Sequence, residues 1–205
     1  MNKHHIIIKK FNEVDSTNRI ALEDETAPHL FTVIADSQTG GRGRIGRSFF
    51  SYSGGLYMSV VFDVAELNIP LNLCTPAAAL AVRDSLEYFG IGGIKIKWVN
   101  DLYKNNRKIC GILTESRSDK GKIEKIVVGI GINLTDPEEG FPEGLKNKAG
   151  CAGYYGNKQT LAVDITKRLD DLVKSGHDDI IYRYRNNILQ KGARGALFSI
   201  SKAYI

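Results

Sequence analysis

The segment 123–134, IEKIVVGIGINL, constrains the fold most strongly, because its apolar and β-branched side chains predict one long buried strand. Its most apolar part, residues 126–134, is far shorter than the roughly 18 residues that a transmembrane helix needs. The sequence therefore predicts a protein built around a sheet, and no membrane span is expected.

The rest of the chain predicts more strands than helices. Further strands are expected at residues 5–11, 31–36, 55–63, 94–98 and 108–116. Helices are expected from the capping residue Ser16 to residue 25, from Thr75-Pro76 to Gly90, and near residues 161–172 and 178–189. Asn105-Asn106 suggests that the strands 94–98 and 108–116 form a hairpin or a near neighbour of one. Because strands and helices do not alternate strictly, we expect an α+β fold in which a mixed β-sheet is packed with helices.

Length and composition predict a folded, cytoplasmic protein with one main domain. The chain has 205 residues, of which 42% are hydrophobic and 25% charged, as is ordinary for globular proteins. Its basic start, MNKHHIIIKKF, contains an apolar run that is too short for a signal peptide. The 3 cysteines and 4 histidines lack the spacing of a disulfide framework or a zinc site, so we assign them no catalytic or metal-binding role.

Positive charge gathers in two regions of this chain, whose net charge is +5. No acidic residue occurs between Asp36 and Asp63, and this window contains Arg42, Arg44 and Arg47. The second cluster surrounds a single carboxylate, Asp101, and consists of Lys95, Lys97, Lys104, Arg107 and Lys108. Both regions are expected to attract anions.

The segment GGRGRIGRSFF, residues 40–50, fits both the dinucleotide fingerprint and the P-loop pattern. Both patterns require that the loop opens into a helix whose N-terminal amides hold a phosphate. Here the loop leads into the predicted strand 55–63, so neither pattern applies. Taken alone, the segment is a basic surface loop or a tract that touches nucleic acid through its charge.

Three further features each have a functional and a structural interpretation. Asp101 is a hard oxygen ligand suited to Mg²⁺, or part of an Asn-Asp turn. Lys108 begins an apolar strand, where a lysine commonly protects the edge of a sheet. Gly129 and Gly131 share one face of the strand 123–134, where they leave a groove for a flat ligand or room for a packed neighbour.

Five sequence blocks occur in order: DSTN at 15–18, QTGGRGRIGR at 38–47, KWVNDLY at 97–103, RKICGILTE at 107–115 and VVGIGINL at 127–134. Together they resemble the catalytic domain of the biotin protein ligases, the biotin-[acetyl-CoA-carboxylase] ligase family. The resemblance implies the fold that these ligases share with class II aminoacyl-tRNA synthetases. It also implies that biotin and ATP form biotinyl-5'-AMP, from which biotin passes to a lysine of a biotin carboxyl carrier protein. The implied cofactors are ATP and Mg²⁺.

The resemblance assigns roles to individual residues. The catalytic residues would be Lys108, Arg44 and Lys97, because fixed positive charge is needed where a carboxylate meets a triphosphate. Biotin would be bound by Ser16, Thr17, Gln38, Gly41, Arg42, Arg44, Lys108, Gly111, Gly129 and Gly131. ATP would be bound by Arg44, Arg47, Phe49, Lys97, Asn100 and Asn133, and the metal by Asp101. The arginine-rich loop would close over the adenylate and keep water away from it.

The chain departs from the family pattern at two positions and at its ends. Val99 stands where the family usually has proline, and Phe49 where many members have tryptophan. We expect no N-terminal helix-turn-helix and hence no DNA binding. A catalytic domain of residues 1–190 would be followed by residues 191–205, a short remnant of a small β module. The sequence agrees with a monomer and with a homodimer.

Two rival interpretations remain. Lipoate or octanoate ligases share the fold and the adenylate chemistry, although GRGRxGR together with KWxND favours biotin. The other rival is a catalytically inert ligand-binding or RNA-binding protein whose basic loop acts only through its charge.

Overall fold

One seven-stranded sheet runs through residues 5–189, which the computed structural model describes. Its strands are β1 (Ile7–Val14), β2 (Phe31–Gln38), β3 (Gly55–Asp63), β4 (Lys95–Lys97), β5 (Asp101–Lys104), β6 (Arg107–Asp119) and β7 (Lys122–Asn133). They lie in the order β1-β2-β3-β7-β6-β5-β4, with β1 and β2 parallel and all other neighbours antiparallel. The predicted mixed sheet is confirmed, and the strand predicted at 123–134 lies at its centre.

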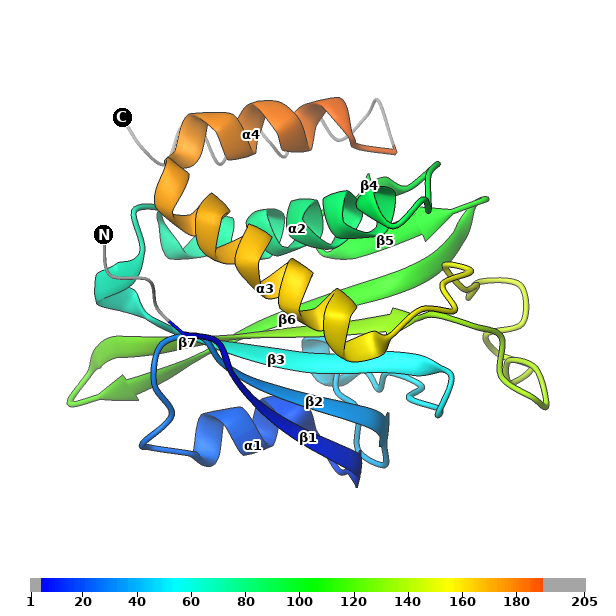
Figure 1. The fold of residues 1–205 in the computed structure, drawn as a ribbon, viewed down its shortest axis with the longest axis horizontal. Coiled ribbons are helices and arrows are strands. Elements are labelled where there is room, and N and C mark those ends of the chain that lie inside the picture. Colours follow the sequence, from blue (N-terminus) through cyan, green and yellow to red (C-terminus); the bar gives the residue numbers. More distant parts are fainter. Residues whose placement is uncertain (1–4, 190–205) are drawn as a thin grey trace.

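Helices cover the two faces of the sheet unequally. Those in the described part of the chain are α1 (Thr17–Glu23), α2 (Cys74–Tyr88), α3 (Lys158–Ser175) and α4 (His177–Asn186). Figure 1 shows α1 alone below the sheet and α2, α3 and α4 above it. The expected α+β fold is therefore confirmed, with one face of the sheet covered only by a short helix.

The side chains of β3 and β7 divide between two apolar clusters, because successive residues of a strand point to opposite faces. Met58 and Ile130 belong to the larger cluster, which packs against α2 and α3. Val61 and Val127 belong to the smaller cluster, where they pack with Ala21 of α1. The strands at the centre are thus buried on both faces where α1 covers them.

Helix ends follow the capping residues that the sequence contains. Ser16 is the N-cap of α1, and its hydroxyl accepts a hydrogen bond from Arg19 N at 3.4 Å. Beyond the end of α2, Gly90 adopts a left-handed φ of 85° and donates to Glu87 O at 3.0 Å. The predicted positions of α1 and α2 are confirmed, although α1 and α4 end slightly before the expected residues.

The turn predicted at Asn105-Asn106 is present, and the strand predicted at 94–98 is a near neighbour of the hairpin rather than one of its two strands. The partner of β6 is β5, which the sequence suggested as a turn, and β4 pairs with the far side of β5. Lys104 pairs with Arg107, so only Asn105 and Asn106 form the turn, with φ of 51° and 60°. Two left-handed residues are typical of a type I′ turn, in which asparagine is common.

The predicted domain of residues 1–190 remains a prediction, and residues 191–205 lie outside the described part of the chain. Among the helices of residues 5–189, none combines the length and the apolarity needed to cross a bilayer.

We expect Asn106→Val to lower the free energy of unfolding by about 1 kcal/mol, because a β-branched residue adopts the left-handed conformation poorly. Asn106→Gly is the matched control and should change this free energy by less than about 0.5 kcal/mol, because glycine adopts the conformation freely. Urea denaturation followed by circular dichroism measures both variants. Equal stability of the two would contradict a left-handed conformation at this position.

Candidate active site

Three glycines leave a hollow on the α1 face of the central strands. Gly111 on β6 pairs with Gly131 on β7, and Gly129 lies on the same face of β7 as Gly131. The intervening residue, Ile130, belongs to the apolar cluster on the opposite face. A cavity of about 360 Å³ opens over these glycines, between α1, the arginine loop (residues 40–50) and the lysines beside β5.

Three side chains lie directly against these glycines, namely those of Asn18, Phe49 and Lys108. A Cβ atom added to Gly129 would lie 2.0 Å from Asn18 Oδ1. A Cβ atom on Gly131 would lie 2.8 Å from the ring of Phe49, and one on Gly111 would lie 3.0 Å from the same ring. The glycines therefore accept packed neighbours and also open onto the cavity, whereas the binding of a flat ligand against them remains a prediction.

Hydroxyl and amide groups form the end of the cavity beside α1. Gln38 Oε1 accepts hydrogen bonds from Thr17 N at 2.9 Å and from Thr17 Oγ1 at 3.1 Å, and its Nε2 donates to Ser51 Oγ at 3.0 Å. Ser59 Oγ on β3 lies 2.8 Å from Thr17 Oγ1 and 2.5 Å from Asn18 Oδ1. Thr17 and Asn18 are buried, so this network holds their side chains in place.

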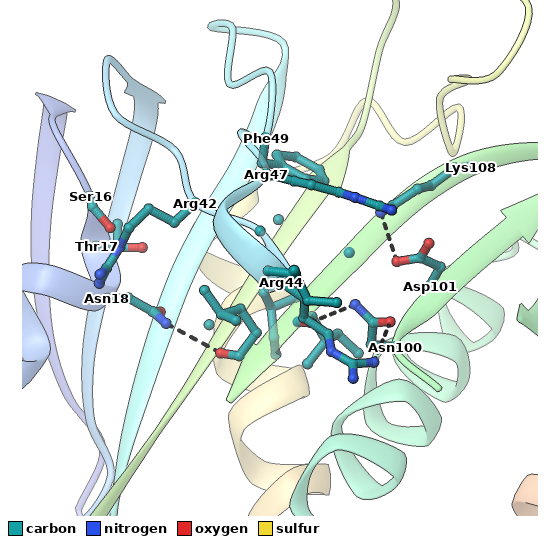
Figure 2. Close-up of a pocket in the computed structure, with 18 of the residues that line it drawn as sticks. Ser16, Thr17, Asn18, Arg42, Arg44, Arg47, Phe49, Asn100, Asp101 and Lys108 are labelled. Atoms are coloured by element: carbon teal, nitrogen blue, oxygen red, sulfur yellow. Dashed lines mark hydrogen bonds and ion pairs between the residues drawn. The ribbon is translucent and has the colours of Figure 1, made fainter. Parts of the chain in front are cut away.

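Figure 2 shows Lys108 and the carboxylate of Asp101 at the opposite end of the cavity, and Lys97 also lines the cavity. Lys108 Nζ lies 2.7 Å from Asp101 Oδ1 and 5.7 Å from the centre of the Phe49 ring. Lys97 Nζ lies 3.5 Å from the hydroxyl of Tyr103 and 5.1 Å from the centre of its ring. The side chains of Lys108 and Asp101 are only 31% and 24% exposed, so water screens their attraction less than that of a surface pair.

The turn between β4 and β5 is held from two sides. Asn100 Nδ2 donates to Ile112 O at 3.0 Å, and Ile112 N donates to Asn100 O at 2.9 Å. From α4, the Tyr184 hydroxyl donates to Val99 O at 2.8 Å, and its ring meets Trp98 edge-on. Burial raises the pKa of Tyr184, so this hydroxyl stays protonated and remains a donor.

The arginine loop is a narrow turn that leads into β3. Phe49 N donates to Gly41 O at 2.9 Å, and Gly43 N donates to Arg47 O at 2.6 Å, so the two arms of the loop are paired. A short 3₁₀ turn at Arg44–Gly46 forms the tip, and the next element is a strand. Neither the dinucleotide pattern nor the P-loop pattern applies, as predicted, because the helix that both require does not follow the loop.

The loop arginines reach toward both walls of the cavity. Arg42 Nη2 donates to Glu115 Oε2 at 3.1 Å, and Arg44 Nη1 donates to Asn100 Oδ1 at 3.4 Å. Figure 2 shows Arg44 between the residues of α1 and the pair of Lys108 and Asp101. Cations from both basic regions therefore line a single cavity, namely Arg42, Arg44 and Arg47 of the first and Lys97 and Lys108 of the second.

Most residues that the sequence assigned to ligands meet in this cavity. Its lining includes Ser16, Thr17, Gln38, Arg42, Arg44, Arg47, Phe49, Lys97, Asn100, Asp101, Lys108, Gly111, Gly129 and Gly131. Gly41 lies outside the lining, and a Cβ atom added to it would lie 2.5 Å from Phe49 O and from Ser51 Oγ. Asn133 also lies outside it and is buried, with Nδ2 donating to Gly150 O at 3.0 Å. Ligand contacts by Gly41 and Asn133 remain predictions.

Several residues of the site were not predicted from the sequence. Asn18 lies inside the DSTN block and lines the cavity, but a cap alone gives no reason to choose its side chain. Trp98 packs beside the core and also lines the cavity. Glu115 binds Asn18 and Arg42 from outside the lining. The alternation of side chains along a strand could have indicated Glu115, because it places Glu115 on the same face of β6 as Gly111.

The protein atoms that line the cavity suit a Mg²⁺ ion only if a nucleotide supplies further ligands to the same ion. Within the described residues, no group of three or more His, Cys, Asp or Glu side chains is placed to hold a metal. Asp101 is the one carboxylate in the lining of the cavity. Mg²⁺ commonly combines one or two carboxylates with water and phosphate oxygens, so Asp101 suits that arrangement and does not form a resident metal centre.

Comparison with known proteins identifies the family. Residues 11–133 match the Biotin/lipoate A/B protein ligase family. The chain belongs to this family. A ligase-family relative, the Bifunctional ligase/repressor BirA of Bacillus spizizenii, is 38% identical over 144 residues, which are 66% of this chain and 43% of that protein. The biotin–[acetyl-CoA-carboxylase] ligase of Paracoccus denitrificans is 35% identical over 163 residues, which are 76% of this chain and 65% of that protein. The chain thus spans less than half the length of the first relative.

The fold is that of the biotin protein ligases within this family. The biotin protein ligase of Aquifex aeolicus in complex with biotin and ATP superposes with a TM-score of 0.77 at 28% sequence identity. The superposition covers 89% of this chain and 78% of that chain. The fold that the sequence resemblance implied is confirmed.

We expect Gly129→Ala to lower the free energy of unfolding by about 1–3 kcal/mol, because the added methyl group would displace Asn18 from a packed position. Gly92→Ala is the matched control, since its Cβ would meet no atom within 4 Å. Thermal denaturation followed by circular dichroism measures both. If Gly129→Ala were as stable as the control, the contact between Asn18 and the strand would be unimportant.

Proposed function

We propose that this protein is a biotin protein ligase, which activates biotin with ATP and transfers it to a lysine of a biotin carboxyl carrier protein. The observation that carries the proposal is the meeting in one cavity of cations from two distant segments, the arginine loop and residues 97–108. The Aquifex aeolicus relative, whose structure holds biotin and ATP, supports this choice of ligands.

In the first step, a carboxylate oxygen of biotin attacks the α-phosphorus of ATP. The new P–O bond forms while the bond to pyrophosphate breaks, which gives biotinyl-5'-AMP and pyrophosphate. Both reactants are anions, so fixed positive charge at the reacting oxygens lowers the barrier. Arg44, Lys97 and Lys108 line the cavity and supply this charge.

Lys108 and its partner set the geometry of the reacting end. In the proposal, Lys108 contacts the carboxylate and the bridging phosphate oxygen, and Lys97 binds phosphate. Asp101 holds Lys108 Nζ at 2.7 Å, which limits the positions that the lysine can take. Asp101 also supplies the protein ligand for Mg²⁺, and this ion neutralises phosphate charge when it is bound.

The remaining residues divide between the two ligands. The hydroxyl and amide groups of Ser16, Thr17 and Gln38 bind the polar ring of biotin, and the backbone at Gly111, Gly129 and Gly131 borders its apolar part. Arg47, Phe49, Asn100 and Asn133 serve the nucleotide. This division is supported by the polar character of the α1 end and the cationic character of the other end.

In the second step, the amine of the carrier lysine attacks the acyl carbon of the adenylate, and AMP leaves. The mixed anhydride must be kept from water until that lysine arrives. The arginine loop is suited to this task, because it lies over the cavity with Ile45 exposed at its tip. We place the reaction in the cytoplasm, where ATP and the carrier are both available.

Biotin-dependent exchange of labelled pyrophosphate into ATP tests the proposed function, with lipoate as the parallel acid. Exchange that requires biotin and not lipoate is expected. Exchange with lipoate alone would point to a lipoate ligase. No exchange with either acid, together with salt-sensitive RNA binding, would favour the inert basic protein.

We expect Lys108→Ala to lower the rate of biotin-dependent exchange by a factor of about 100 or more, the scale on which a preorganised charge acts in a transition state. Lys167→Ala removes the same charge from the exposed surface of α3, on the other side of the sheet, and should leave exchange unchanged. Circular dichroism should show both variants folded. Near-normal exchange in Lys108→Ala would reject its catalytic role.

We expect Arg44→Gly to release biotinyl-5'-AMP more readily than the unaltered protein, because the loop loses both a cation and its bond to Asn100. Arg44→Lys keeps the charge and should release less. The measurement is the spread of biotin to an unrelated protein, such as serum albumin, in the same mixture. No increase in this labelling by Arg44→Gly would count against the role of the loop as a cover.

A further inference from the structure

Glu115 on β6 joins the arginine loop to α1. Its Oε2 atom accepts hydrogen bonds from Asn18 Nδ2 at 2.7 Å and from Arg42 Nη2 at 3.1 Å. Asn18 and Arg42 both line the cavity, whereas Glu115 does not. One carboxylate oxygen therefore connects two walls of the site from behind the residues that face a ligand.

The two bonds to Glu115 differ in how easily they open. Asn18 is only 5% exposed, and its amide also donates to Leu113 O at 3.2 Å and lies 2.5 Å from Ser59 Oγ. The side chain of Arg42 is 44% exposed, with Glu115 as its partner. A buried amide with several partners is costly to free, whereas a half-exposed ion pair opens at a small cost. Glu115 thus stays with Asn18, and the bond to Arg42 is the one that can break.

Arg42 differs from the other arginines of the loop because it is paired with a carboxylate. Within residues 5–189, Glu115 is the one carboxylate that pairs with a loop arginine. Arg44 bonds the neutral amide of Asn100, and Arg47 lines the cavity. The charge of Arg42 is balanced by its partner, so Arg44 and Arg47 are the arginines whose charge is left for an anionic ligand.

We propose that Glu115 is a positioning residue that places the arginine loop over the cavity by binding Arg42. This inference rests on the proposed function, in which the closed loop retains the acyl-adenylate. Arg42 serves as the anchor of the loop, and Arg44 and Arg47 act on the ligand. Because Glu115 also holds Asn18, it aligns the loop with the polar end of the cavity.

Tryptic cleavage of the free protein measures the placement of the loop without any substrate. Glu115→Gln and Arg42→Gln should each speed cleavage after Arg44 and Arg47, by up to about fivefold, the range expected for a half-exposed ion pair. The double variant should be cleaved no faster than the faster single variant, because both changes remove the same pair. Arg42→Gln alters a half-exposed side chain, so it carries the test if Glu115→Gln is poorly folded.

The matched control is Glu124→Gln, which makes the same change at an exposed position of the neighbouring strand β7 and should be cleaved at the unaltered rate. With biotin and ATP, Glu115→Gln and Arg42→Gln should release biotinyl-5'-AMP faster, while the maximal rate of pyrophosphate exchange changes less. Unaltered cleavage in both single variants, or additive effects in the double variant, would overturn the inference. Absence of exchange in the unaltered protein would instead reject the proposed function, and the cleavage rates would still decide whether Glu115 anchors the loop.

Discussion

The site depends on a contrast between the two faces of β6 and β7. On one face, Ile130 and Ile132 are buried in the main apolar cluster, which fixes both strands against α2 and α3. On the other face, Gly129 and Gly131 have no side chains, so the cavity lies directly on the backbone of the central strand β7. Strand β7 pairs with an antiparallel strand on each side, which makes it rigid. A site needs such rigid support to hold reacting groups in place.

The order of the strands explains why distant cations meet. The arginine loop comes just before β3, and Lys108 lies on β6, while the sheet places β3 and β6 on either side of β7. Side chains that enter from the two neighbours of one strand converge above it. The cavity therefore receives positive charge from both sides, and the single carboxylate in its lining, Asp101, is paired with Lys108.

Sequence patterns predicted the parts of this arrangement that follow from local chemistry. The central strand at 123–134, the α1 cap at Ser16 and the strand after the arginine loop all follow from residue type and spacing. β5 escaped prediction because it is short, and because the Asn-Asp pair at its start equally favours a turn. The positions of Asn18 and Phe49 also escaped, since a glycine predicts free space in a strand but not which distant side chain fills it. Glu115 could have been placed on the correct face, whereas its two partners come from contacts between α1, the loop and β6 that only the folded chain creates.

The bracing of the β4–β5 turn has a consequence for how the protein is made. Tyr184 of α4 bonds Val99 O, and Leu189 N donates to Ile96 O at 2.8 Å, so the cationic end of the cavity is supported by the last part of the described chain. A nascent chain on the ribosome holds Arg44, Lys97 and Lys108 long before Tyr184 has emerged. Synthesis thus delivers the reactive side chains early and their support late, and the order of translation delays the bracing of this turn until α4 has emerged.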